Sequence, residues 1–165
     1  MFSKELESVK NAFFEAMMHG WASGNDGRPI DGRPDWKQTV YTTVDGKYLV
    51  ADRWGTDPAT GKPTGSTLIT TIEHQIPVWV MRYGGDSYEK RAIPTLRAAL
   101  MKLYAESRFY GCRGPSMFEE DNLSYKNYCE GNFAQFEGTE HIYDKTTCDV
   151  LGTHEYWGGS LLYLK

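Results

Sequence analysis

Apolar side chains recur every three or four residues along the first part of the chain, which is the period of an amphipathic helix. Ser3 precedes this stripe and suits a helix N-cap, and Gly20 follows it and suits a helix end. The pattern therefore predicts a helix over residues 3–19. The residues of the stripe are Leu6, Val9, Phe13, Ala16 and Met17.

The same period returns in the second half of the chain. Pro94 is tolerated in the first turn of a helix, and apolar residues continue from there at helical spacing. The pattern predicts a second helix over residues 94–106, with one face turned to a core. The residues of this stripe are Leu96, Ala99, Leu100, Leu103 and Tyr104.

Outside the helices, short runs rich in β-branched and aromatic residues are typical of strands. Turn sequences such as Asp45-Gly46 and Gly131-Asn132 separate neighbouring runs and favour antiparallel hairpins. The chain thus predicts four strands before the second helix and three after it. The runs cover residues 36–44, 47–54, 66–73, 76–83, 123–130, 133–143 and 148–157.

Two segments are rich in turn residues and are predicted as loops, residues 20–36 and residues 112–120. The first contains Asp-Gly-Arg-Pro twice, at residues 26–29 and 31–34. This doubled motif has two interpretations. It is either a mobile loop or a lid that carries Arg28 and Arg33 to an anionic ligand.

The two halves of the chain share their order of elements and their turn residues. Asp45-Gly46 corresponds to Asp121-Asn122, Gly65 to Gly138, and Gly84-Gly85 to Gly158-Gly159. We infer a single α+β domain over residues 1–165, with pseudo-repeats of approximately 1–85 and 86–165. Two αβββ repeats would form a mainly antiparallel β-sheet or half-barrel packed by two helices. The alternative is that glycine turns recur by chance in a β-rich chain.

The charge and hydropathy of the chain argue against nucleic-acid binding and against a membrane span. The 165 residues carry a formal net charge of −4 with acidic and basic residues interleaved, so we expect no direct nucleic-acid partner. We find neither an apolar run long enough to cross a membrane nor the pattern of a secretory leader, so we expect a cytoplasmic protein. Cys112, Cys129 and Cys148 are widely spaced and are expected to be free thiols.

Several short segments follow one another in a recognisable order along most of the chain. They are PVWVMRYGG at residues 77–85, RGP at 113–115, FEGTE at 136–140 and WGG at 157–159. Together they resemble a bacterial family known as a domain of unknown function, DUF 5680. The resemblance implies a small bacterial protein, fused in some members behind a helix-turn-helix domain, and it brings no activity, cofactor or catalytic residue. The chain departs from the family's pattern between Trp54 and Gly65 and in the doubled Asp-Gly-Arg-Pro loop.

Alternation along the predicted strands places large side chains on common faces. If the aromatic rows converge, they line a pocket for a small-molecule ligand, edged by polar groups that include Arg82 and Glu155. The alternative is a filled core whose rim charges are solvated or paired. The candidate ligand-binding residues are Asp52, Trp54, Trp79, Met81, Tyr83, Arg113, His154 and Trp157.

Neither catalytic residues nor a metal site can be identified from the pattern. His154 and Glu155 are adjacent in a predicted strand, so their side chains face opposite ways and cannot serve one site. His141 and His154 are candidate metal ligands, with Glu140 or Asp149 as a further ligand. Their spacing, however, is not diagnostic of a metal site. The sequence therefore predicts no catalytic residue, no metal and no cofactor.

Three function classes stay open. The first, which we favour, is a ligand-binding or sensor domain. The second is an interaction module that forms a homodimer through Phe2, Phe14 and Met18, which lie off the main stripe of the first helix. The third is a hydrolytic enzyme with Asp52, His154 or Glu155 near the pocket.

Overall fold

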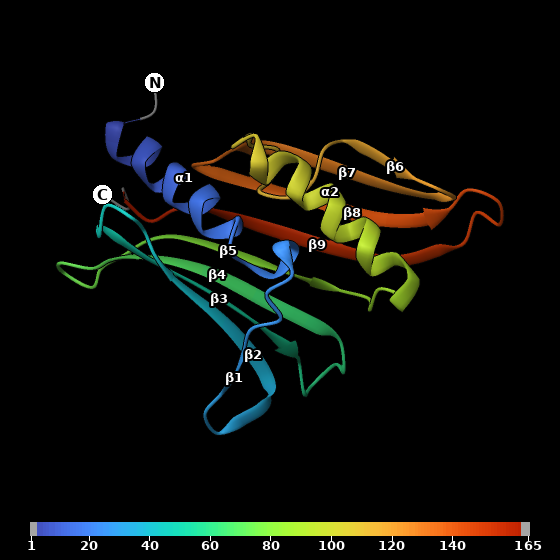
Figure 1. Cartoon of the computed structure of the whole chain (residues 1–165), viewed down its shortest axis with the longest axis horizontal. Coiled ribbons are helices and arrows are strands. Elements are labelled where there is room, and N and C mark those ends of the chain that lie inside the picture. Colours follow the sequence, from blue (N-terminus) through green and yellow to red (C-terminus); the bar gives the residue numbers. More distant parts are fainter. Residues whose placement is uncertain (1–2, 163–165) are drawn as a thin grey trace.

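The structure is a computed structural model that describes residues 3–162. These residues form one nine-stranded antiparallel sheet with two α-helices packed across it (Figure 1). The strands are β1 (Arg28–Ile30), β2 (Arg33–Thr42), β3 (Tyr48–Thr56), β4 (Pro63–Thr71), β5 (Pro77–Gly85), β6 (Met117–Glu120), β7 (Leu123–Asn132), β8 (Gln135–Asp144) and β9 (Val150–Ser160). The helices are α1 (Lys4–Met17), the 3₁₀ turns η1 (Trp21–Ser23) and η2 (Lys90–Ala92), and α2 (Ile93–Ala105).

Both α-helices form where the apolar stripes predict them. Ser3 caps α1, since its Oγ accepts a hydrogen bond from the amide of Leu6 at 3.1 Å. Pro94 occupies the first turn of α2, where its missing N–H has no helical partner to lose. Each stripe is buried, so tertiary packing and local propensity favour the same structure.

The order of strands across the sheet is β1-β2-β3-β4-β5-β9-β8-β7-β6. Consecutive strands pair as hairpins on both sides, and β5 and β9 join the two sides, with Tyr83 opposite Tyr156. Apart from the edge strand β1, the order is symmetric about the β5–β9 pair. The inferred α+β class with a large antiparallel sheet is confirmed, and the sheet stays open.

Two short strands lie in segments that the sequence predicts as loops. β1 begins at Arg28, within the first Asp-Gly-Arg-Pro motif, and the chain then turns at Gly32, whose φ is +73°, to pair with β2. β6 pairs with the beginning of β7. Both are edge strands of three and four residues, too short to show an alternating pattern. The first half therefore supplies a helix and five strands and the second half a helix and four strands, each with one short edge strand, where the inferred repeat has three strands. An origin by duplication stays a prediction.

An aromatic core lies under α1 on the inner face of the sheet. Trp79 on β5 is fully buried and stacks on Phe133, with ring centroids 4.9 Å apart. The indole N–H of Trp79 donates to the carbonyl oxygen of Phe133 at 3.0 Å. Phe13 of α1 packs 5.2 Å from the Trp79 ring. These rings bury a large apolar area in tilted and stacked geometries that aromatic pairs prefer.

The helix α1 exposes fewer apolar side chains to a possible partner than the sequence suggests. Phe14 is only 2% exposed, and it packs against Phe13 and Tyr104 inside the protomer. Met18, just after the helix, is 38% exposed. Phe2 lies outside the described residues. Phe14 is therefore not available to a partner on this helix.

Candidate functional site

A cavity of about 290 Å³ lies between the inner face of the sheet and the helices, beside the aromatic core. Its walls come from α1, η1 and α2 on one side and from β3, β4, β5 and β9 on the other. The volume is close to the lower end of small-molecule sites, which span roughly 300–1,000 Å³. Most of the lining is apolar, and includes Phe13, Met17, Trp54, Met81, Leu96 and Leu100.

The carboxylate of Asp52 is the acidic group of the cavity. It lies on the inner face of β3, and the residue is 8% exposed. Its Oδ1 accepts hydrogen bonds from the hydroxyls of Tyr83 at 2.7 Å and Thr67 at 3.1 Å, whereas no residue of the range 3–162 donates to Oδ2. Asp52 also borders a second hollow of about 150 Å³ under α1. Burial raises the pKa of Asp52, because the hydroxyls and the nearby Arg113 offset only part of the lost hydration.

Arg113, in the segment between α2 and β6, brings a positive charge to the cavity wall. Its Nε donates to Oε1 of Glu140 at 2.9 Å, and its Nη2 donates to the same oxygen. The Tyr125 hydroxyl donates to the other oxygen of Glu140 at 2.6 Å. Glu140 is fully buried on β8, so the two charges neutralise each other as a buried pair. The guanidinium carbon of Arg113 also lies 5.3 Å from the centroid of the Tyr83 ring.

His154, on the inner face of β9, lines the same cavity. Both of its ring nitrogens are buried, and neither finds a hydrogen-bond partner in the described part of the chain. The ring lies edge-on to Tyr88, with centroids 4.7 Å apart. Burial, together with the positive charge of Arg113, lowers the pKa of His154 to about 4. The imidazole is therefore neutral near pH 7 and forms part of the cavity wall.

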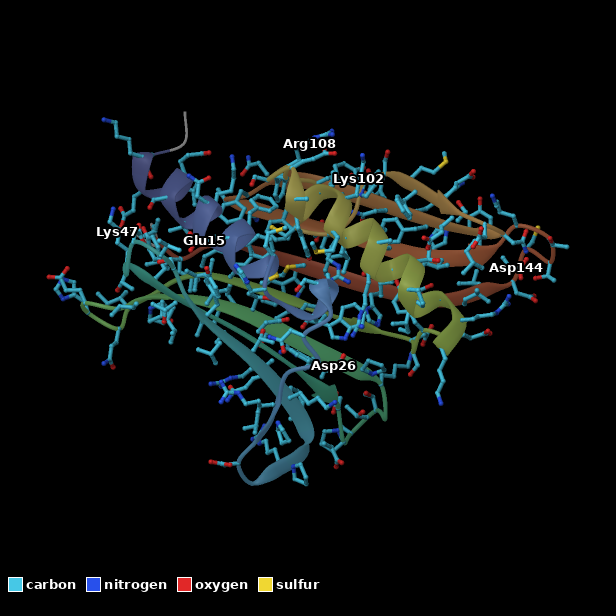
Figure 2. The ribbon with its side chains drawn as sticks, viewed as in Figure 1. Glu15, Asp26, Lys47, Lys102, Arg108 and Asp144 are labelled. Atoms are coloured by element: carbon cyan, nitrogen blue, oxygen red, sulfur yellow. The ribbon has the colours of Figure 1, made fainter. Side chains whose placement is uncertain are left out.

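Trp21 of η1 and Trp54 of β3 form one edge of the cavity. The guanidinium of Arg97 on α2 lies 4.5 Å over the Trp21 ring and donates to Oδ1 of Asp26 at 2.6 Å. Asp26, labelled in Figure 2, lies on the connection from η1 to β1. The next residue, Gly27, lies so close to Trp54 that a Cβ would be 2.6 Å from the ring. The connection after α1 is thus held along the cavity edge by α2 and β3.

The structure brings six of the eight candidate residues to this cavity. The other two lie elsewhere. Trp79 is 0% exposed in the aromatic core, and Trp157 is 53% exposed on the opposite face of the sheet. Arg82 and Glu155 share that outer face with Trp157, because all three alternate with inward residues. The six that line the cavity are Asp52, Trp54, Met81, Tyr83, Arg113 and His154.

Sequence reasoning missed the helical wall of the cavity and the partner of Arg113. The helical residues were part of apolar stripes, which have the same pattern whether they fill a core or border a cavity. Glu140 offered a clearer signal, since it lies between the inward residues Phe136 and Ile142 on alternating positions of β8. A carboxylate in such a row needs a buried partner. The missed lining residues include Trp21, Tyr88, Leu96, Leu100 and Tyr104.

The doubled motif does not carry its arginines to the cavity. Arg28 and Arg33 are both exposed in the β1–β2 hairpin and are absent from the cavity lining. His141 and His154 alternate onto opposite faces, because Glu140 is the residue paired with His154. Within residues 3–162, no group of three or more His, Cys, Asp or Glu side chains is arranged to hold a metal ion.

The three cysteines are free thiols at different depths: Cys112 is buried, Cys129 is partly buried and Cys148 is exposed. Burial raises the pKa of the Cys112 thiol, which disfavours a reactive thiolate. None of the helices in the described part of the chain is long and apolar enough to span a bilayer.

These features define an α+β protein with an open antiparallel sheet, helices across its inner face and a small, mostly apolar cavity between them. The family model described as Domain of unknown function (DUF5680) matches residues 62–161, and the chain belongs to this family. Comparison with the curated proteins and with the solved structures found no match. The matched range begins just before β4, so it includes Tyr83, Arg113 and His154 but neither Asp52 nor Trp54.

Proposed function

We propose that this chain is a small-molecule-binding domain whose ligand occupies the cavity between the sheet and the helices. The observation that carries the proposal is the convergence of Asp52, Tyr83 and Arg113 on one mostly apolar cavity. A few convergent polar groups in an apolar hollow are the usual composition of a ligand site.

A binding or sensor role fits this geometry better than catalysis. In the described range, the hydrogen bonds of Asp52 come from two neutral hydroxyls, Tyr83 and Thr67. General acid–base catalysis needs a group that can exchange a proton with the substrate, often oriented by a second titratable group. The low pKa makes His154 a weak base, and its ring nitrogens make no hydrogen bond to Asp52 or to any other described residue, so His154 does not supply that partner.

The test compares two tryptophans on opposite faces of the sheet. Native mass spectrometry of protein purified gently from its expression host is compared with the same sample after denaturation. We expect a non-covalent mass on the wild type and on Trp157→Ala, and its loss from Trp54→Ala, because only Trp54 lines the cavity. Bare protein in all three samples, with no shift of cavity methyl signals when small apolar probes are added, would contradict the proposal.

A second candidate, the association of two copies, is favoured by the outer face of the sheet. Trp157 and Tyr128 are 53% and 62% exposed there, beside a shallow groove of about 820 Å³. In the strand register, Trp157 lies between Arg82 on β5 and Glu137 on β8. A two-fold axis along β9 would place Arg82 of each copy against Glu137 of the other, so the pattern is self-complementary.

Sedimentation velocity tests this second candidate through charge reversal. Arg82→Glu should weaken the dimer, because it places two like charges opposite each other. Adding Glu137→Arg to that variant should restore the dimer, since the pair is then reversed but complementary. A wild type that sediments as a monomer at micromolar concentration would exclude association through this face.

A further inference from the structure

The buried charges at the cavity do not balance. Arg113 is neutralised by Glu140, whose other oxygen accepts from Tyr125. Asp52 accepts hydrogen bonds from neutral hydroxyls only, and the ion pairs of the described residues include none to Asp52. Two carboxylates and one guanidinium therefore sum to one negative charge when Asp52 is ionised. Burying a charge without a counter-ion costs free energy, so a cation bound from solution would stabilise the ionised Asp52.

The walls near Asp52 suit a cation that is attached to an apolar body. The Tyr83 ring reaches Asp52 through its hydroxyl, and Trp54 lies two residues further along the same face of β3. Aromatic faces attract cations through their ring quadrupoles. The Tyr83 ring already lies 5.3 Å from the guanidinium carbon of Arg113, so the ammonium would lie against Trp54. Beyond them, Met81 and Leu96 continue the cavity with apolar surface. Cation-binding and apolar surfaces thus meet in one cavity.

We propose that the ligand is a small amine whose ammonium group pairs with Asp52 and whose aromatic or branched apolar body fills the rest of the cavity. This inference rests on the proposed function and names its ligand class. The ammonium would donate to Oδ2 of Asp52, the oxygen to which no residue of the described range donates. An anion is disfavoured, because Asp52 repels it and Arg113 is already paired with Glu140.

The raised pKa of Asp52 agrees with this assignment. Without a counter-ion, the buried carboxylate takes up a proton more readily than an exposed one. A bound ammonium ion favours the ionised carboxylate, so at a pH low enough for Asp52 to be partly protonated, binding releases protons from Asp52. The affinity for an amine should therefore rise with pH until Asp52 is fully ionised, and fall again once the amine itself loses its proton.

Calorimetric titration of the full chain with three matched probes tests the inference. The probes are 2-phenylethylamine, 2-phenylethanol and phenylacetate, which share a phenyl ring and differ in charge. We expect the amine to bind about ten-fold more tightly than the alcohol, a difference that one well-placed ion pair can supply, and phenylacetate to bind least. Titration in two buffers of different ionisation enthalpy should show proton release for the amine alone.

Two variants assign the effect to Asp52. Asp52→Asn should reduce amine affinity to that of the alcohol, whereas Asp35→Asn should leave it unchanged, because Asp35 is exposed on β2 and does not line the cavity. The proton-release measurement uses the wild type, so it decides the question even if Asp52→Asn does not fold. Amine binding without proton release at any pH in a series of titrations at decreasing pH would overturn the pairing with Asp52.

The outcomes also separate this inference from the proposed function. Equal affinity for all three probes, or a preference for phenylacetate, would overturn the amine class and leave the cavity as a ligand site. Failure of every probe to bind would count against both.

Discussion

Gly65 lies directly opposite Tyr83 in the β4–β5 pair, and the space above Gly65 holds the Tyr83 ring. A Cβ at Gly65 would overlap that ring. The ring can therefore cross β4 and bring its hydroxyl to Asp52 on β3. The other half of the sheet repeats the arrangement: Gly138 lies opposite Tyr156, whose hydroxyl donates to Asn127 at 2.6 Å.

Gly65→Ala is expected to destabilise the protein by about 1–3 kcal/mol, because the added methyl group forces the Tyr83 ring from its place. The urea unfolding free energy measures this. Gly20→Ala is the control, since a Cβ at Gly20 would meet its nearest atom at an ordinary 3.6 Å. That variant should stay within about 0.5 kcal/mol of the wild type. Equal unfolding free energies for the two variants would show that Tyr83 moves aside at no cost.

Glu140→Gln is expected to cost about 3–5 kcal/mol, because it leaves the Arg113 charge buried without its partner. Unfolding in urea measures the loss, with Glu7→Gln as the control, since Glu7 pairs with Lys10 at the surface. The double variant Arg113→Met/Glu140→Gln should be less destabilised than the two single losses added together. Additive losses would indicate that the two charges do not interact.

His154 should make the protein less stable as the medium becomes mildly acidic. Its pKa is about 4 in the folded protein and about 6.5 in an unfolded chain, so between these values the unfolded chain binds more protons. The contribution of His154 is complete above about pH 6.5 and falls by up to about 1.4 kcal/mol per pH unit towards pH 4. Unfolding free energies at about pH 7.5 and about pH 5 test this.

The variant His154→Phe removes this titration and should reduce the difference between the two pH values. His74→Phe is the matched control, because His74 is exposed and should leave the pH difference as it is in the wild type. Asp52 has a raised pKa and acts in the opposite direction at low pH, but it is present in all three proteins. An unchanged pH difference in His154→Phe would mean that His154 is already protonated in the folded protein at pH 5.

Trp79→Ala and Trp157→Ala should differ sharply in stability. Trp79 is fully buried between Phe13 and Phe133, so its loss should cost about 3–5 kcal/mol. Trp157 is half exposed on the outer face, and its loss should stay within about 0.5 kcal/mol. Thermal and urea unfolding measure both. A small loss for Trp79→Ala would place this residue outside the core and return it to the ligand-binding candidates.

The sequence predicted the elements that are long enough to show a period. Both α-helices and the seven longer strands carry a repeating apolar pattern, whereas β1 and β6 contain three and four residues and carry none. The symmetric strand order needed the register of β5 with β9, which no local pattern specifies. The expected cytoplasmic location and the absence of a nucleic-acid partner stay predictions.

For the candidate site, the alternation of side chains along the strands predicted the face of the sheet on which a residue lies. It did not predict whether that residue lies in the core or lines the cavity. It placed Asp52 with Trp54, and Tyr83 with Trp79, on the inner side of their strands. It could not tell that Trp79 lies under α1 while Tyr83 reaches the cavity, because that depends on where the helices cross the sheet. On β9 the prediction was wrong for Trp157: it was expected in the pocket with His154, but Trp157 lies on the outer side of the strand and His154 on the inner side.

The β5–β9 pair also has a consequence for the order of folding. Every other strand pair joins neighbours along the chain, so it closes a short loop, whereas β5 can meet β9 only across the whole segment from η2 to β8. Contacts between such distant residues are expected to form late. The cavity includes side chains from both β5 and β9, so it exists only after this seam has closed. A molecule bound in the cavity would therefore stabilise the pairing of β5 with β9 and oppose the separation of the two halves of the sheet.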